Sequence, residues 1–355
     1  MDRTTMTGLL ERCLLTGSPS GAEAGLAKLV IGELDARGIP CEPDAAGNVL
    51  VRFGGTGGER PLVMVTGHLD EIGMTVKRIE EDGRLRLSPL GGSLPHKFGE
   101  GPVEVLGDDA SCTGILSYGS LHSTEQSGPQ YAQSPDGAAG AVHWKHWWVE
   151  TKLTPERLRE AGVRPGTKVT PARSRRAPVR LGEDHLSGYG MDDKVAVPIL
   201  IDLAERLTRT PPAVSTVLAF TTREEIGGLG GAWAAGELRP EVLIAIEVAP
   251  VMPEYGVHAG PDPVLWNQDV YGVADGEVVR ALHEAAGRGG IVLQDLVSEI
   301  GATDASCAAR AGHTARPATI SVACENTHGW EIVHLDALGR VAGVLEEYLR
   351  AGVGA

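Results

Sequence analysis

Two adjacent carboxylates, Glu224 and Glu225, follow an apolar, β-rich run of this sequence. Three other apolar runs of strand length also end in a side chain that can bind a metal or move a proton: His68, Glu247 and His328. A carboxylate pair at a single strand end is usually a solvated surface feature, but four runs with the same kind of ending indicate a shared site. Imidazoles and carboxylates without a thiolate are the ligands of hydrolytic zinc, cobalt or manganese centres.

The first of these runs, residues 61–66, continues into residues 67–71, which read Gly-His-Leu-Asp-Glu. Side chains alternate along an extended chain, so His68 and Asp70 point the same way. This geometry suits a metal-binding imidazole whose tautomer is fixed by a neighbouring carboxylate. A lone His-x-Asp pattern is more often structural, and its interpretation here depends on the other three runs.

Helical patterns separate the runs. Apolar residues recur at helical spacing at 4–15, 20–37, 277–288, 304–311 and 335–350. Strands that alternate with helices predict a largely parallel sheet, covered on both faces, with ligands at the carboxyl ends of its strands. The four runs would then surround one crevice, and Asp192, at the start of a helical pattern, would be a fifth member unless it only caps that helix. With one bridging carboxylate, five such ligands give each of two metals three protein contacts and leave room for a shared water.

Residues 73–182 have a different sequence pattern. Short alternating segments and many glycines replace the long apolar runs, which predicts a small β-rich domain inserted into the sheet domain. The sheet domain is therefore assigned to residues 1–72 plus 183–355, and the insert to residues 73–182. Residues 143–148 hold three of the six tryptophans, and we interpret them as a strand whose aromatic side chains fill the core of the insert or a subunit interface.

The composition limits the possible partners. The chain has 355 residues, of which 42% are hydrophobic, and its 32 basic and 47 acidic residues give a formal net charge of −15. A charge of this sign argues against nucleic acid and anionic membranes. The five cysteines are widely spaced and form no Cys-x-x-Cys pair, so a disulfide framework and a thiolate zinc site are disfavoured and a cytoplasmic location is expected. No apolar run reaches the ~18 residues of a membrane span, and residues 1–17 do not resemble a signal peptide.

Motifs met in order along the chain resemble those of the dinuclear-metal, TET-type aminopeptidase family, which includes glutamyl and deblocking aminopeptidases and proteins once labelled cellulase M. They are GHLDEIG at 67–73, MDDK at 191–194, TTREEIG at 221–227, AIEV at 245–248, GATDA at 301–305 and the final His328. Residues 18–23 add to the resemblance, which covers nearly the whole chain. It implies a zinc-peptidase-like α/β fold: a mostly parallel mixed sheet covered by helices on both faces, with an inserted small β-rich domain used for dimerisation or higher oligomerisation.

The same resemblance assigns metal-binding roles. It implies two divalent metal ions per subunit, with zinc foremost and cobalt or manganese as alternatives. Asp192 would bridge the two ions. His68 and Glu247 would complete one metal site, and Glu225 and His328 would complete the other.

The resemblance also implies a reaction. Glu224 would be the general base that activates the metal-bound water, and Asp70 would orient His68. The expected activity is hydrolysis of N-terminal residues from short peptides, by a homo-oligomer between a dimer and a dodecamer. A related dinuclear amidohydrolase (carboxypeptidase, dipeptidase or N-deacylase) is one alternative, and a catalytically silent assembly scaffold is another. A glycosidase is disfavoured because Glu224 and Glu225, adjacent on an extended strand, would lie on opposite sides of it.

Three positions depart from the family pattern. Glu247 stands where the family usually has Asp, Lys194 stands where Arg is common, and residues 325–327 read Glu-Asn-Thr where Arg-Tyr-aliphatic is more usual. The extra methylene of Glu247 is expected to change the position or the affinity of the metal. The change at 325–327 is expected to alter substrate selection.

Overall fold

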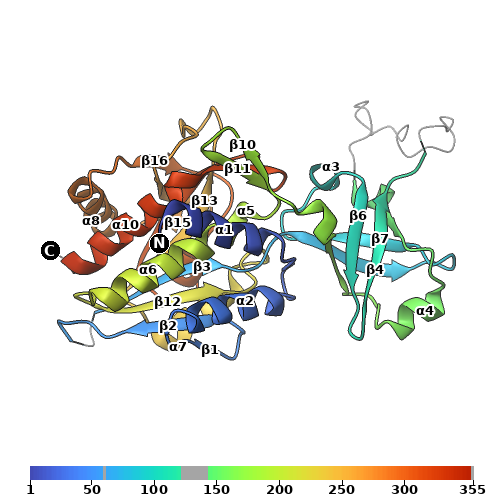
Figure 1. Cartoon of the computed structure of the whole chain (residues 1–355), viewed down its shortest axis with the longest axis horizontal. Helices are drawn as coiled ribbons and strands as arrows, with labels where there is room; N and C mark the ends of the chain where they lie inside the picture. The colour runs from blue at the N-terminus through green and yellow to red at the C-terminus, as the bar shows by residue number, and fades with distance from the viewer. Residues whose placement is uncertain (59–60, 121–142, 353–355) are drawn as a thin grey trace. The chain divides into compact units, whose positions relative to one another are not determined.

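The computed structural model of the chain describes residues 1–58, 61–120 and 143–352. It divides into two compact units, Met1–Glu71 with Pro178–Ala355, and Ile72–Ala177 (Figure 1). The boundary predicted after residue 182 falls inside the larger unit, because β10 (Val179–Leu181) pairs with β11 (His185–Gly188) in that unit's sheet.

Four parallel strands form the middle of the larger unit's sheet, in the order β12, β3, β13 and β17. They are Ser215–Thr221, Leu62–His68, Val242–Pro250 and Arg316–Glu325. Each corresponds to one of the four apolar runs, as expected for strands buried on both faces. Further strands, mostly antiparallel, extend the sheet on both sides: β1 (Glu42–Pro43), β2 (Val49–Phe53), β14 (Val264–Asp269), β15 (Gly272–Val273), β16 (Gln294–Val297) and β18 (Glu331–His334), with β11 and β10.

Helices cover both faces of this sheet, so the predicted α/β class with a mixed sheet is confirmed. Val65 and Ile244 face one helical layer, whereas their neighbours Met64 and Leu243 face the other, as strand alternation requires. The first layer holds α1 (Arg3–Leu14), α2 (Ala24–Asp35), α6 (Ala196–Arg209), α8 (Gly276–Arg288) and α10 (Leu335–Ala351). The second layer holds α7 (Leu229–Leu238) and α9 (Asp304–Arg310), and the short α5 (Met191–Lys194) precedes α6. Among the described residues, no helix is both long and apolar enough to cross a membrane.

The smaller unit is a closed barrel whose strands follow the order β4, β5, β8, β7, β6 and β9. In that order they are Gly73–Ile79, Leu85–Leu90, Trp148–Glu150, Ser111–Ser117, Gly101–Leu106 and Lys168–Pro171. Short helical segments lie between them: α3 (Pro95–Phe98), η2 (Trp144–His146) and α4 (Pro155–Glu160); η3 (Arg173–Arg175) follows the last strand, β9. Residues 121–142 of the predicted insert lie outside the described residues.

The strand predicted at 143–148 is wrong for most of its length. Residues 144–146 form the 3₁₀ turn η2, and β8 begins only at Trp148. Trp144 and Trp147 are 9% and 4% exposed within the barrel core. Two inward side chains three residues apart suit a 3₁₀ turn, whereas a strand would turn them to opposite faces. Trp144 and Trp147 therefore fill the core as expected, but not from a strand, whereas Trp148 in β8 is only partly buried.

Candidate metal centre

The candidate ligands gather where two neighbouring parallel strands stop pairing. β3 and β13 form a ladder only as far as Thr66 and Ala245. Beyond that point β3 remains paired with β12, and β13 with β17. His68 and Glu247 each lie two residues further on, so alternation directs both side chains to the α7 and α9 face of the sheet. The expectation that a strand ends at Glu247 is wrong, because pairing with β17 carries β13 on to Pro250.

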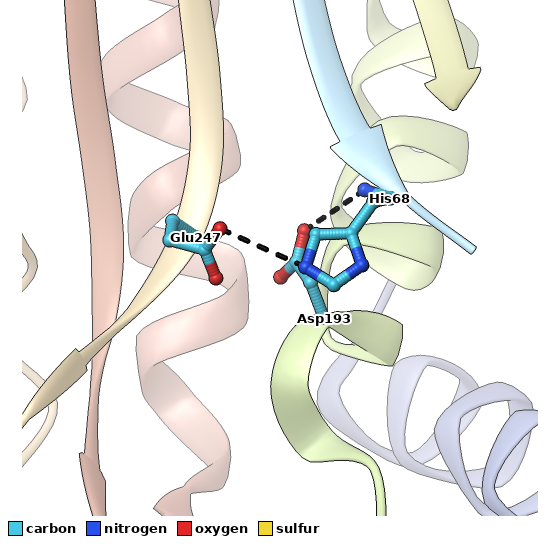
Figure 2. Close-up of side chains that lie close together, drawn as sticks. All are labelled: His68, Asp193 and Glu247. Atoms are coloured by element: carbon cyan, nitrogen blue, oxygen red, sulfur yellow. Dashed lines mark hydrogen bonds and ion pairs between the residues drawn. The ribbon is translucent and has the colours of Figure 1, made fainter. Parts of the chain in front are cut away.

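His68, Asp193 and Glu247 form one group of ligating side chains, here called the inner cluster (Figure 2). All three are buried, and their ligating atoms lie within 4.8 Å of one another. Glu247 Oε2 is 3.7 Å from His68 Nε2, and Asp193 Oδ2 accepts a hydrogen bond from the backbone N–H of His68 at 3.1 Å. Gly67 permits this approach of α5 and α6 to β3, because a Cβ there would lie 2.3 Å from the Cβ of Ala196.

Asp192, Glu225 and His328 form a second group, here called the outer cluster, whose ligating atoms also lie within 4.8 Å of one another. His328 Nε2 is 3.4 Å from Asp192 Oδ2 and 3.8 Å from Glu225 Oε2. All three residues are partly exposed, and of their side chains that of His328 is the most exposed, whereas the carboxylates of Asp192 and Glu225 are largely buried. Glu225 and His328 come from turns, because β12 ends at Thr221 and β17 ends at Glu325.

The expectation that Glu224 and Glu225 extend a strand is wrong. Arg223 has a φ of 56°, a left-handed conformation that turns the chain after β12. The backbone N–H of Gly228 then donates to the carbonyl of Glu224 at 2.8 Å. The two glutamates therefore belong to a turn, and strand alternation does not exclude a glycosidase.

Asp192 belongs to the outer cluster and also faces the inner one. Its Oδ1 is 3.1 Å from His68 Nε2, and its Oδ2 is 3.4 Å from His328 Nε2. A carboxylate that presents one oxygen to each of two imidazoles has the geometry of a bridging ligand. Asp192 is not a helix cap, because Gly190 precedes α5 and Val195 precedes α6.

Asp70 supports both His68 and the turn that carries the two glutamates. Its backbone carbonyl is 3.0 Å from His68 Nδ1, closer than its carboxylate Oδ1 at 3.5 Å. The carboxylate instead accepts hydrogen bonds from the backbone N–H of Glu224 at 2.8 Å, the backbone N–H of Glu225 at 3.2 Å and the Ser20 hydroxyl at 2.6 Å. A proton on Nδ1, held by the carbonyl, leaves the Nε2 lone pair of His68 for a metal.

Lys194 is buried in an ion pair. Its Nζ lies 2.5 Å from Glu71 Oε2 and donates a hydrogen bond to the carbonyl of Thr16 at 2.8 Å. Glu71 also accepts a hydrogen bond from the backbone N–H of Ser18 at 3.2 Å. The lysine charge is thus matched by its own carboxylate, and the pair joins α5 to the segment that follows β3.

Buried carboxylates dominate the charge of the site. Burial, and after it the charge of Asp192, raises the pKa of Glu225 to about 8, and burial raises the pKa values of Glu224 and Glu247 well above their usual range. Burial disfavours a proton on His328, but the hydrogen bond with Asp192 and the charge of Glu225 outweigh it and raise the pKa of His328 to about 10. Protons therefore balance a negative charge that metal cations would balance equally well.

Unpaired oxygens indicate that the site suits cations. Asp193 Oδ1 in the inner cluster and Glu225 Oε1 in the outer cluster are buried and have no hydrogen-bond partner in the described part of the chain. A buried polar atom without a partner is unfavourable unless a proton or a cation satisfies it. Oxygen and imidazole donors without sulfur are what zinc, cobalt and manganese accept in hydrolytic sites, so the residues present fit a pair of divalent ions.

Two residues of the site, Asp193 and Glu331, are not marked by the sequence pattern. Asp193 is adjacent to Asp192, but adjacency alone does not tell which of two aspartates faces a given ligand. Glu331 accepts hydrogen bonds from the backbone N–H groups of Asp192 and His328, and its partner Asp192 is 139 residues away in the chain. No local pattern signals a contact over that separation.

Proteins of similar sequence are peptidases by name. A lysyl aminopeptidase from Pyrococcus furiosus is 28% identical over 242 residues, which cover 68% of this chain and 65% of that protein. The match therefore spans less than two thirds of that relative's length.

Solved structures share the fold over almost the whole chain. An aminopeptidase from the archaeon Desulfurococcus kamchatkensis has a TM-score of 0.85 and 24% identity, and the match covers 99% of this chain and 96% of that one. The TET1 peptidase of Pyrococcus horikoshii has a TM-score of 0.82 and 24% identity, with 97% and 99% covered. At this identity the two structures show the shared fold alone. The model of the M42 glutamyl aminopeptidase family matches residues 47–343, a range that contains every candidate ligand, and the chain belongs to that family.

Proposed function

We propose that this chain is a dinuclear metal-dependent aminopeptidase that hydrolyses N-terminal residues from short peptides. The observation that carries the proposal is Asp192, whose two carboxylate oxygens face the imidazoles of two separate ligand clusters. Membership of the M42 family and the similarity to a lysyl aminopeptidase support a reaction on peptides.

Five side chains would hold the two ions. His68 and Glu247 with Asp192 would hold one, and Glu225 and His328 with Asp192 would hold the other. Zinc is the first candidate, and cobalt and manganese accept the same donors. When bound, two such ions polarise the scissile carbonyl and lower the pKa of a water molecule.

Glu224 is the residue that would move protons. Its Oε2 lies 3.9 Å from His68 Nε2, and its backbone N–H is held by the carboxylate of Asp70. Burial raises the pKa of Glu224 above its usual range, which makes this carboxylate a stronger proton acceptor than an exposed glutamate. Glu224 would accept a proton from the attacking water at this oxygen and return it to the departing amine.

Matched peptides with free and acetylated N-termini test the proposal. The protein is loaded with zinc, cobalt or manganese, and products are identified by mass spectrometry. We expect only the free peptide to lose residues stepwise from its N-terminus, because an aminopeptidase needs the free amine. Release from the C-terminus would indicate a carboxypeptidase, cleavage of dipeptides alone a dipeptidase, and loss of the acyl group an N-deacylase. Fewer than one bound ion per chain after metal incubation would favour a silent scaffold.

Assembly is a separate part of the proposal. The TET1 peptidase of Pyrococcus horikoshii can assemble into a tetrahedron or a large octahedral shell, and we infer that this chain also forms a homo-oligomer, between a dimer and a dodecamer. Size-exclusion chromatography with light scattering measures the mass, and a monomer would contradict the inference.

All five cysteines are free thiols, which supports a cytoplasmic location that cell fractionation can check.

A further inference from the structure

Glu331 lies outside the predicted ligand set but between two of its members. It is the first residue of β18, and it pairs with Gly188, the last residue of β11, in an antiparallel ladder. β18 follows the turn that carries His328, and β11 leads into the segment that carries Asp192. The antiparallel pairing therefore brings these two distant segments side by side at the position of Glu331.

Both carboxylate oxygens of Glu331 are used there. Oε1 accepts a hydrogen bond from the backbone N–H of His328 at 2.8 Å, and Oε2 accepts one from the backbone N–H of Asp192 at 3.2 Å. The residue is 1% exposed, so water competes little for these bonds. A single side chain thus joins the backbones of two residues of the outer cluster.

The backbones that Glu331 joins need such support. His328 has a φ of 60°, a left-handed conformation that non-glycine residues seldom adopt unless their surroundings hold them. It lies beyond the end of β17, and no ladder of the sheet includes it. The third member of the outer cluster, Glu225, is held in a comparable way by the carboxylate of Asp70.

We propose that Glu331 is a positioning residue for the outer metal: by binding both backbones it sets the separation of His328 and Asp192 and thereby the affinity of the outer cluster for its ion. This inference rests on the proposed dinuclear centre. Glu331 contacts neither ligand's side chain through these two bonds, so it acts on the metal through the backbone. Supporting residues of this kind typically change metal affinity by about 10- to 100-fold when they are replaced.

The test is a metal titration of Glu331→Gln. The protein is stripped with a chelator and titrated with Co²⁺, and binding is followed by calorimetry and by the visible absorption of the bound ion. The Gln side chain keeps one acceptor oxygen, so one of the two backbone N–H groups loses its partner. We expect the second equivalent to bind about 10- to 100-fold more weakly. The first equivalent should weaken much less, because His68 and Glu247 stay fixed by the sheet and only Asp192 is shared. The larger change of the spectrum is therefore expected for the second equivalent.

Glu241→Gln is the matched control. Glu241 Oε2 also accepts a hydrogen bond from a backbone N–H, that of Leu62 at 2.8 Å, at the end of β3 opposite to His68. We expect this variant to bind both equivalents normally. Unchanged binding of both ions by Glu331→Gln would overturn the role of Glu331. Equal weakening of both ions, together with a lower melting temperature of the metal-free protein, would also overturn it.

A second variant covers the case in which Glu331→Gln does not fold. Glu331→Asp keeps the charge but is one methylene too short to reach both backbones, and the same selective loss of the second equivalent is expected. If neither variant folds, Glu331 is a structural residue and the inference is wrong. Fewer than two equivalents in the unaltered chain would instead contradict the proposed dinuclear function, and the inference would fall with it.

Discussion

The two ligand clusters are built in different ways. The side chain of His68 in the inner cluster is 2% exposed, whereas that of His328 in the outer cluster is 33% exposed. His68 and Glu247 lie within strands of the central sheet. Glu225 and His328 lie on turns beyond strand ends.

The difference shows what positions each ligand. Sheet ladders fix the backbones of His68 and Glu247 in the inner cluster. Hydrogen bonds from the backbone to two buried carboxylates, Asp70 and Glu331, fix the backbones of the outer cluster. The inner cluster is therefore determined by the fold itself. The outer cluster depends on a few side chains, and we expect its ion to be the weaker and the more exchangeable of the two.

The largest expected effect is that of replacing Glu224, and it separates loss of turnover from loss of metal binding. Glu224→Gln removes the proton acceptor but leaves both clusters intact, so we expect turnover to fall by about 10²- to 10⁴-fold. Two ions per chain should remain, as measured by elemental analysis. Near-normal turnover would show that another group moves the proton, and loss of metal would show that Glu224 is a ligand.

A direct test of the comparison replaces one histidine at a time. We expect His68→Ala to weaken the tightest-bound ion by about one to two orders of magnitude or more, since loss of a ligand exceeds loss of its support. His328→Ala should leave that ion in place and weaken only the second. Calorimetric titration with zinc measures both affinities. The reverse assignment, with the tight ion lost only in His328→Ala, would break the comparison.

A smaller effect concerns pH. The pKa values of His328 and Glu225 are raised, to about 10 and about 8, so both groups hold protons at neutral pH that a metal must displace. Apparent affinity for the outer ion should therefore rise as pH increases from 6 to ~8. Calorimetry in buffers of different ionisation enthalpy counts the protons released. His328→Ala should release fewer, and an affinity independent of pH would contradict the assignment.

The smallest effect comes from a hydroxyl group that supports Asp70. Ser20→Ala removes the 2.6 Å hydrogen bond to the carboxylate of Asp70, and we expect the free energy of unfolding to fall by about 1.5–3 kcal/mol, as for hydrogen bonds to charged groups. Ser298→Ala is the control: its hydroxyl donates to the neutral carbonyl of Ile300, and about 0.5–1.5 kcal/mol is expected. Equal losses of unfolding free energy in the two variants, measured by urea denaturation, would indicate that the hydrogen bond to Asp70 is no stronger than one to a neutral carbonyl.

The main features of the fold could be predicted because buried parallel strands appear as continuous apolar runs. The central strands were located in this way, and both histidines follow such runs. Glu247 was identified as a candidate ligand for the same reason, although its strand continues. The end of a strand depends on its neighbours, and here β17 extends β13 past Glu247 while β3 separates from it.

Other features of the site could not be predicted from local patterns. The turn after β12 depends on the left-handed conformation of Arg223, which a β-rich run does not reveal. Asp192 was chosen as a ligand and Asp193 was given no role, because the direction of each side chain is decided by the backbone between β11 and α6. Glu331 contacts Asp192 only because β11 and β18 pair in register.

The separation of the ligands along the chain affects the order in which the centre can form. It joins residues from His68 to Glu331, and the unit Ile72–Ala177 interrupts the chain between His68 and the remaining ligands. Contacts between such distant segments close long loops and form late in folding. A nascent chain that has passed Glu247 but not yet reached His328 therefore carries four of the five proposed ligands without carrying the completed centre.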